Sequence, residues 1–305
     1  MAKKASILLN LLQFTPKKIK VILSSFNDLD YILKATYSDF KEVSSLGEKD
    51  IEKILALRSS NCLDNELRLI EKEKIKCLDI FEGEYPDILR QISNPPLLLY
   101  IRGLSDVFNK FIFSIVGSRT PTAYGIRQAS KFSHDLASHG AVIISGLARG
   151  IDTAAHKAAL RCGETIAVLG SGLNNIYPRE NANLAAQISQ RGALVSEFPL
   201  GASPAKENFP RRNRIVSGLS RGVLVIEAAA RSGASITAHL AAEQNREVFA
   251  LPGNIDSPLS KGTNSLLKEG VKLVDCLDDI LEEFPDTFKE NINLSCKAHT
   301  YESCH

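Results

Sequence analysis

The sequence lacks the cysteine patterns of disulfide-bonded and zinc-binding proteins. Its 305 residues include six cysteines, none of them in a C-x-x-C pair. Cysteines without regular spacing are typical of a reducing cytoplasm, and we expect a cytoplasmic protein. Near the end of the sequence, Cys296, His299, Cys304 and His305 lie close together. Because their spacing fits no standard zinc site, we expect no metal there.

Long apolar runs are also missing. No segment approaches the roughly 20 apolar residues of a membrane span, so we expect no membrane contact. The N-terminal run Ile7–Phe14 is broken by Asn10 and Gln13 and has no small-residue cleavage site, so we expect no signal peptide. The net charge is only +2. Any affinity for nucleic acid must therefore come from local clusters of charge.

Common catalytic motifs are absent as well. The sequence contains no G-x-S-x-G, no H-E-x-x-H and no G-x-x-x-x-G-K-[ST] segment. His156 and His239 lie in helical patterns beside alanines, which favours packing roles. Glu227, at the end of a predicted strand, could act as a base or cap the next loop. We find no pair of nucleophile and base, and we predict no catalytic residues.

The first part of the sequence has a helical pattern. The segment "DIEKILALR" places Ile51, Ile54 and Leu55 near one face of a helix, with charges opposite. We predict a helical domain over residues 1–80 and, over 81–110, a linker that leads into the next domain. "SSLGEKDIEKIL" indicates a helix, a glycine turn and a second helix. A helix-hairpin-helix contact with DNA and a plain helical bundle are both open.

From Phe111 onward, short apolar runs alternate with helical patterns. The apolar runs are "FIFSIVG", "AVIISG", "TIAVLG", "ALVSEF", "GVLVIEA" and "EVFALPG". Continuous apolar strands separated by helices are typical of a parallel sheet covered on both faces. We predict an α/β fold with an extended Rossmann-type, doubly wound, mostly parallel sheet over residues 111–284. The polar residues 285–305 are expected to form a disordered tail.

Loops rich in small residues follow several of these strands. Ligands bind such sheets beyond the carboxyl ends of the strands, where glycines let the backbone approach an anion and helix N-termini offer free N–H groups. We expect arginines there to add charge on one rim. The binding candidates in these loops are Gly117, Ser118, Arg119, Gly146, Arg149, Gly150, Ser232, Gly233 and Ser235. For any single loop, a tight turn without a ligand is the alternative.

The segment Gly170-Ser171-Gly172 raises the alternative of a dinucleotide site. The full G-x-G-x-x-G fingerprint needs a third glycine, and Asn175 stands in its place. Glu197, at the end of the next predicted strand, has the position of a ribose-binding acid. Because the glycine pattern is incomplete, we expect no cofactor.

The segment "NFPRRNRIVSGLS" concentrates cations around one aromatic residue. Between Lys206 and Arg221, five basic residues accompany one glutamate, a local net charge of +4. We predict that Pro210 keeps Phe209 in an extended loop, where the ring can stack on bases while arginines bind phosphates. The alternative is that the ring plugs the core. As a rim residue, Arg212 is expected to add little to stability.

These segments together resemble the DNA-processing protein A family, also called DprA or Smf. The resemblance covers about residues 86–283 and rests on "VGSRTPTAYG", "SGLARGIDTAAHKAAL", "TIAVLGSGLNNIYPREN", "GALVSEFPLG", "NFPRRNRIVSGLS" and "VLVIEAAARSGASITAHLAAEQNREVFALPGNIDSPLSKGTN". It implies an extended Rossmann domain that binds single-stranded DNA without sequence preference and forms a homodimer. It also implies protection of incoming DNA and loading of the RecA recombinase during natural transformation, without a catalytic step.

The resemblance further implies which residues bind DNA. They are Arg119 of "GSR" and the K-x-x-F-P-x-R-N-R set, which in this chain is Lys206, Phe209, Arg212, Asn213 and Arg214. Arg211 falls at the variable position and is a weaker candidate. The N-terminal segment is similar to the family's helical domain, of the sterile-alpha-motif or helix-hairpin-helix kind. Many members carry a C-terminal winged-helix domain, for which this sequence ends too soon.

A nucleotide-binding or nucleoside-phosphate-cleaving enzyme of a Rossmann type is the alternative function. Some Rossmann relatives cleave N-glycosidic bonds of nucleotides with a Gly-Gly-x-Gly-Thr loop. The corresponding turn here is "RSGAS", which lacks that loop. We therefore predict a DNA-binding protein that is not an enzyme.

Overall fold

The N-terminal part of the chain is helical. The structure is a computed structural model that describes residues 2–26 and 28–288, and its first elements are α1 (Ala2–Leu11), α2 (Pro16–Ser25), the short 3-10 helix η1 (Leu29–Leu33), α3 (Tyr37–Lys41), α4 (Glu48–Ser59) and α5 (Cys62–Lys72). Thr15 caps α2 by accepting the N–H of Lys18, and Pro16 fills its first position. These helices bury their own apolar core around Leu8, Ile22 and Phe40.

The second part is built on a nine-stranded sheet. Its strands are β1 (Lys76–Asp79), β2 (Leu98–Gly103), β3 (Ile112–Val116), β4 (Val142–Ser145), β5 (Thr165–Val168), β6 (Ala193–Ser196), β7 (Gly222–Val225), β8 (Glu247–Ala250) and β9 (Lys272–Leu273). They lie in the order β1-β2-β6-β5-β4-β3-β7-β8-β9. β2 pairs antiparallel with both β1 and β6, whereas the pairs from β6 to β9 are parallel. The predicted doubly wound, mostly parallel α/β fold is confirmed.

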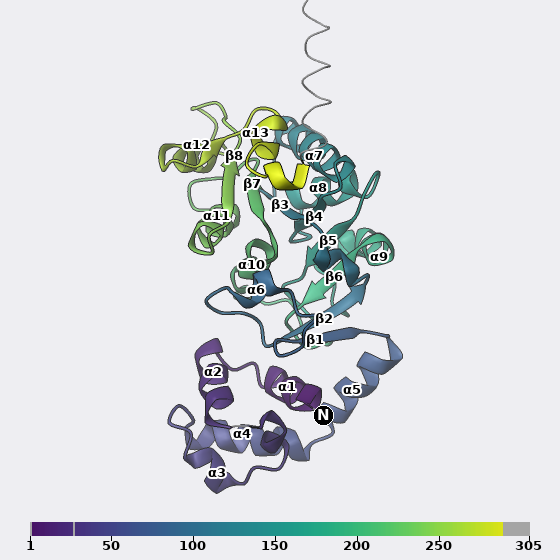
Figure 1. The fold of residues 1–305 in the computed structure, drawn as a ribbon, viewed down its shortest axis with the longest axis vertical. Coiled ribbons are helices and arrows are strands. Elements are labelled where there is room, and N and C mark those ends of the chain that lie inside the picture. Colours follow the sequence, from purple (N-terminus) through teal and green to yellow (C-terminus); the bar gives the residue numbers. More distant parts are fainter. Residues whose placement is uncertain (1, 27, 289–305) are drawn as a thin grey trace, which may run out of the picture.

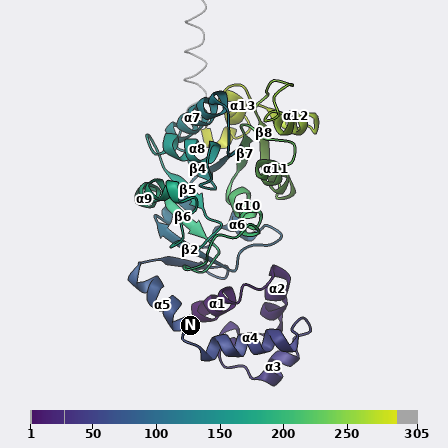
Figure 2. The same cartoon turned by 180° about the vertical axis from the view of Figure 1, so that it is seen from behind.

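Helices cover both faces of this sheet (Figure 1, Figure 2). They are α6 (Asp87–Arg90), η2 (Asp106–Asn109), α7 (Ala123–Ser138), α8 (Ile151–Ala159), η3 (Arg179–Asn181), α9 (Ala182–Arg191), α10 (Asn208–Leu219), α11 (Gly233–Glu243), α12 (Lys261–Lys268) and α13 (Asp278–Leu281). One apolar core lies between the sheet and α10, α11 and α12, and another between the sheet and α7, α8 and α13. The strands are therefore buried on both sides, as their continuous apolar sequences predict.

Two features extend the sheet domain beyond the predicted range. β1 lies in the range predicted to be the helical domain (1–80) and β2 in the predicted linker (81–110), yet both strands belong to the sheet. At the other end, Phe288 is buried against Phe111, so the fold continues past residue 284. The rest of the expected tail, which includes Cys296, His299, Cys304 and His305, lies outside the described residues. Among residues 2–26 and 28–288, no helix has the length and apolar character needed to cross a bilayer.

Candidate nucleic-acid interface

A cavity of about 670 Å³ opens at the carboxyl ends of the central strands. β3 and β7 are neighbours, although the chain passes through β4, β5 and β6 on one side of β3 before it returns to β7 on the other. At such a switch point the loops diverge and leave a crevice. The lining includes residues that follow β3, β4 and β7 and residues of α10, among them Gly117, Ser118, Arg119, Gly146, Asp152, Tyr177, Lys206, Phe209, Arg212, Asn213, Ser232 and Gly233.

The segment that supplies Phe209 is a helix and not the predicted extended loop. α10 begins at Asn208, so Phe209 and Pro210 lie in its first turn. Proline is compatible with a first turn, because the N–H groups there have no acceptor within the helix. At 3.6 residues per turn, positions 209, 212 and 213 share one side of α10, whereas 211 and 214 point away from it.

Phe209 is half-buried at the wall of the cavity. Its ring packs on the backbone of Gly170, where a Cβ atom would lie 2.8 Å from the ring atom Cδ1. The guanidinium carbon of Arg119 lies 5.5 Å from the ring centre, and the centre of the Tyr177 ring is also 5.5 Å away. These contacts hold the ring by its edge and by cation–π attraction while leaving part of it open to solvent. Tyr177 is a candidate that sequence reasoning missed, although it is an exposed aromatic residue in "NNIYP".

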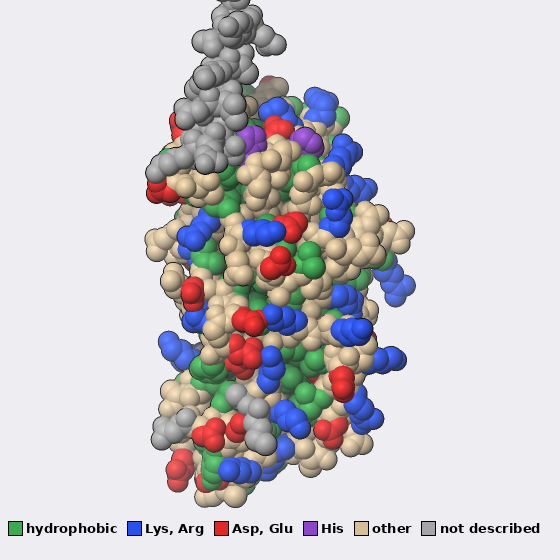
Figure 3. All heavy atoms as spheres, turned by 45° about the vertical axis from the view of Figure 1, so that its right-hand side comes forward, with side chains coloured by type: hydrophobic (Ala, Val, Ile, Leu, Met, Phe, Trp, Pro, Cys, Tyr) green, Lys and Arg blue, Asp and Glu red, His purple; other side chains and the backbone are tan. Residues whose placement is uncertain are grey.

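Arg119 and Lys206 supply accessible positive charge at this cavity. Both side chains are exposed, and among the described residues neither forms an ion pair. On the side of the molecule shown in Figure 3, cationic and anionic side chains are interspersed along the whole length. Because the overall charge is mixed, unpaired cations beside an aromatic ring mark the cavity as a local site for an anion with a flat group.

Arg212 lies at the floor of the cavity and not on its rim. The residue is only 4 % exposed. Its Nη1 donates to the carbonyl oxygen of Gly146 at 2.6 Å and also to that of Val168. Burial lowers its pKa to about 10, so it stays charged at neutral pH beside the buried Asp152. The placement of Arg212 on the rim is wrong, and because it satisfies carbonyl groups at the ends of β4 and β5 we expect it to add to stability.

Asn213 and the start of α11 complete the floor. The amide nitrogen of Asn213 donates to the carbonyl oxygen of Gly233 at 3.3 Å. The hydroxyl of Ser232 accepts the N–H of Ser235 at 3.2 Å and thereby caps α11. The N-terminus of an eleven-residue helix therefore opens onto the cavity, and its dipole favours an anion there.

Several predicted binding residues lie outside this cavity. Arg149 pairs with Glu180 through two contacts of 2.8 and 2.7 Å, and Gly150 and Ser235 are not part of the lining. Arg211 and Arg214 project from the far side of α10 to Glu197. The grouping of Arg214 with Phe209 and Arg212 therefore needs correction. Neighbours in a loop sequence became opposite sides of a helix.

The residues that suggested a dinucleotide site or a catalytic base form structural contacts instead. Phe209 fills the space at Gly170 in the turn considered for a dinucleotide, and Glu197 is bound by two arginines. Glu227 accepts both the N–H and the hydroxyl of Thr122, at 2.9 and 2.6 Å, and thereby holds the residue that caps α7. The buried His156 lies 2.7 Å from the hydroxyl of Thr165, and burial lowers its pKa to about 3. It is therefore neutral.

The fold is that of a doubly wound α/β protein with cationic and aromatic side chains in the crevice at its switch point. The chain belongs to the family of DNA recombination-mediator protein A, whose family model matches residues 76–285. The recognition of this family from the sequence motifs is confirmed.

Individual relatives agree with this assignment. The chain is 54% identical over 200 residues to protein Smf of Escherichia coli. The aligned segment covers 65% of this chain and 54% of that protein. It thus spans about half the length of this relative. The crystal structure of DprA from Streptococcus pneumoniae matches 91% of this chain and 96% of its own, at 36% identity and a TM-score of 0.79. A DprA structure from Helicobacter pylori, described for its single-stranded DNA binding mode, matches 70% and 97%, at 30% identity and a TM-score of 0.64.

Proposed function

We propose that this chain binds single-stranded DNA without sequence preference in the cavity at the switch point. The observation that carries the proposal is the exposed Arg119 stacked over the half-buried ring of Phe209, with Lys206 on the same rim. The part of the ring that is open to solvent can stack on an unpaired base, which is worth about 1–3 kcal/mol per base. The cations and the N-terminus of α11 suit the phosphates on either side.

The site residues we propose for this role are those that line the cavity: Arg119, Lys206, Phe209, Arg212 and Asn213, with Tyr177 as an addition. Arg212 serves mainly by holding the floor in shape, because its guanidinium bonds backbone carbonyl groups. We do not assign a DNA contact in this cavity to Arg211 or Arg214.

At the level of the cell, we propose a mediator of recombination during natural transformation. In this role the protein would protect incoming single strands, act as a cytoplasmic homodimer and load RecA onto the DNA without a catalytic step. The support is membership of the family and the similarity to DprA proteins of Streptococcus pneumoniae and Helicobacter pylori. The division into a helical domain, a DNA-binding domain and a tail also stays a proposal, with the sheet domain starting at β1 and reaching Phe288 instead of running from 111 to 284.

The test is a titration of labelled oligo-dT of increasing length, beside dTMP and NAD. We expect affinity to rise with length, single strands to be preferred over duplex, and the mononucleotides to bind weakly. If about four phosphates are neutralised, log affinity should fall with log salt at a slope near −3. The control variant is Arg161→Ala, which removes an exposed arginine at the end of another helix. Its affinity for oligo-dT should match that of the wild type. Tight mononucleotide binding with release of a free base would instead support a nucleotide-cleaving enzyme.

A further inference from the structure

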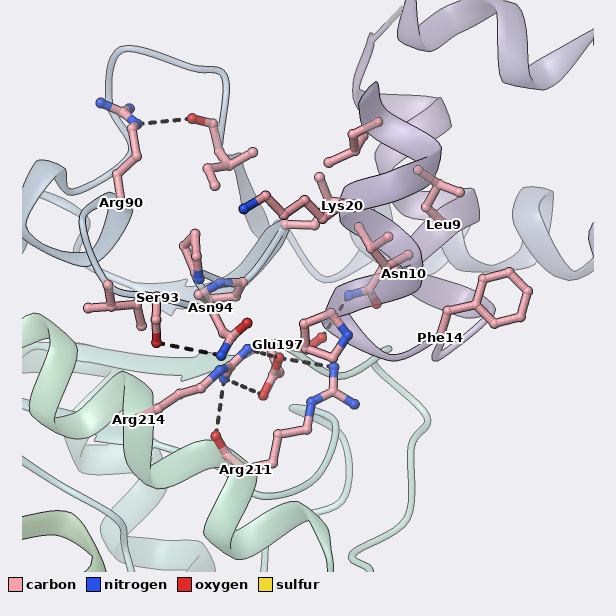
Figure 4. Close-up of a pocket in the computed structure, with 18 of the residues that line it drawn as sticks. Leu9, Asn10, Phe14, Lys20, Arg90, Ser93, Asn94, Glu197, Arg211 and Arg214 are labelled. Atoms are coloured by element: carbon pink, nitrogen blue, oxygen red, sulfur yellow. Dashed lines mark hydrogen bonds and ion pairs between the residues drawn. The ribbon is translucent and has the colours of Figure 1, made fainter. Parts of the chain in front are cut away.

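A second cavity, of about 360 Å³, lies between the helical part and the sheet domain. Figure 4 shows α1 and α2 on one side, the segment between β1 and β2 on another, and α10 below. The lining includes apolar residues of both parts of the chain together with the charged residues Lys20, Arg90, Glu197, Arg211 and Arg214. This set shares no residue with the lining of the DNA cavity.

The base of this interdomain cavity is a buried carboxylate bound by two guanidinium groups. Glu197 is 2 % exposed. Its two oxygens accept from Nη1 and Nη2 of Arg214 at 2.8 and 2.7 Å, and Arg211 donates to it at 3.1 Å. One carboxylate thus faces two guanidinium groups, and no second carboxylate of the lining balances the remaining positive charge. The Arg211 side chain keeps 31% of its surface exposed, so its guanidinium can still take up an anion in the cavity.

The walls have the opposite character. Apolar residues of the helical part (Phe14, Ile19 and Leu23) and of the β1–β2 segment (Ile92, Pro95 and Pro96) contribute most of the lining. Lys20 is exposed at the mouth, and in Figure 4 its side chain extends from α2 towards the β1–β2 segment. Four cationic residues and one anionic residue line the cavity, a net charge of +3.

The helical part and the sheet domain meet at this same point. The side-chain amide of Asn10 donates to the carbonyl oxygen of Glu197 at 2.8 Å, and Arg211 donates to the side chain of Gln13 at 3.4 Å. A ligand in the cavity would therefore contact both parts of the chain at once. The size of the cavity lies in the range of about 300–1,000 Å³ that small-molecule sites occupy.

We propose that the interdomain cavity binds a small organic anion with an apolar body and one carboxylate or phosphate end. The apolar walls take the body, and Arg211 and Lys20 take the charged end. A DNA strand is the poorer fit, because it would bring a row of phosphates against walls that are mostly aliphatic. Binding here goes beyond the DNA-binding role, and it uses the other side of α10.

The test uses the fluorescent apolar anion anilinonaphthalene sulfonate with the full chain. We expect one saturable site and a higher melting temperature with the probe present. Decanoate and decyl phosphate should both displace the probe, and their relative strength shows whether the carboxylate or the phosphate is preferred. Lys20→Glu should weaken probe binding about tenfold. Lys17→Glu, the same charge reversal one helical turn away and outside the lining, should leave binding within about twofold.

A second variant addresses the volume of the cavity. Ser93 is exposed and belongs to the lining, so Ser93→Trp should fill space without loss of a core contact, abolish saturable probe binding and keep oligo-dT affinity. Probe binding that is absent, unsaturable, or equally weakened by Lys17→Glu and Lys20→Glu would overturn the proposal. Displacement of the probe by oligo-dT, together with reduced oligo-dT affinity of Lys20→Glu, would show instead that the cavity is part of the DNA path.

Discussion

The two sides of α10 use the same residue type for different purposes. On one side, Phe209 and Arg212 form a wall and the floor of the cavity at the switch point. On the other side, Arg211 and Arg214 hold the buried Glu197 beneath the helical part of the chain. Three arginines within four positions therefore have two different environments. A cluster of charge in the sequence is not a cluster in space once the segment is helical.

The positive charge proposed for DNA binding therefore does not come mainly from the arginine run of α10. The run of arginines supplies mainly internal contacts, whereas the accessible cations of the cavity are Arg119, from the loop after β3, and Lys206, which precedes α10. Variants on the two sides should accordingly move different quantities. Those in the arginine run should lower stability, and those at the cavity rim should lower DNA affinity.

The largest effect is expected for Arg212→Ala. The change leaves the carbonyl groups of Gly146 and Val168 without their donor and removes the charge beside buried Asp152. We expect a loss of about 4 kcal/mol in the free energy of unfolding, measured by urea titration. Arg161→Ala is the control, with a change below about 0.5 kcal/mol. An unaltered unfolding midpoint for Arg212→Ala would contradict the placement of this residue in the floor.

Glu197→Gln should be the next most damaging change. It leaves two guanidinium groups without their carboxylate on the side of α10 that faces the helical part. We expect about 3 kcal/mol less stability. Oligo-dT affinity, measured at a temperature where the variant is folded, should change less than about twofold. A large loss of oligo-dT affinity without a loss of stability would contradict this prediction. It would mean that DNA contacts the side of α10 that carries Arg211 and Arg214.

Phe209→Ala separates binding from stability at the cavity itself. We expect about 1–3 kcal/mol of lost oligo-dT affinity and, because the ring is only half-buried, about 1 kcal/mol of lost stability. Phe209→Tyr should retain most of the affinity, since a tyrosine ring still stacks. Phe81→Ala, at an exposed phenylalanine outside both cavities, is the matched control. Strong destabilisation with intact affinity would mean that Phe209 is a core residue.

Tyr177→Ala should give the smallest of these effects. Its ring contacts Phe209 from the exposed side, so it orients the stacking surface and can extend it. We expect about 1 kcal/mol of lost affinity in the same titration, with stability unchanged. Equal affinities for the variant and the wild type would restrict the stacking surface to Phe209.

The sequence predicted the sheet domain well, because its strands are continuous apolar runs and each is followed by a small-residue loop. The small residues after these strands also predicted the loops that line the cavity at the switch point. The edge strands were harder, since the four residues of β1 carry no periodicity of their own. The helical start at Phe209-Pro210 was missed because proline was taken as a helix breaker, although a first turn accepts it.

Contacts between distant segments were beyond prediction. Glu197 had the position of a ribose-binding acid, yet its partners are arginines on α10 and Asn10, which lies 187 positions away. The ion pair of Arg149 with Glu180 likewise removes a rim arginine that was expected at the cavity. Both outcomes depend on the side of a helix or loop from which a side chain projects. A shift of one position along the chain changes that side.

The central claim is that DNA binds on one side of α10 and not on the other. The most direct measurement is an oligo-dT titration over a range of salt for Arg119→Gln beside Arg214→Gln, each of which removes one charge. Arg119→Gln should lose about 2 kcal/mol of affinity, and its salt slope should become shallower by about 0.7. Arg214→Gln should keep the affinity and slope of the wild type while melting at a lower temperature. An equal loss of affinity and slope in Arg214→Gln would contradict the account.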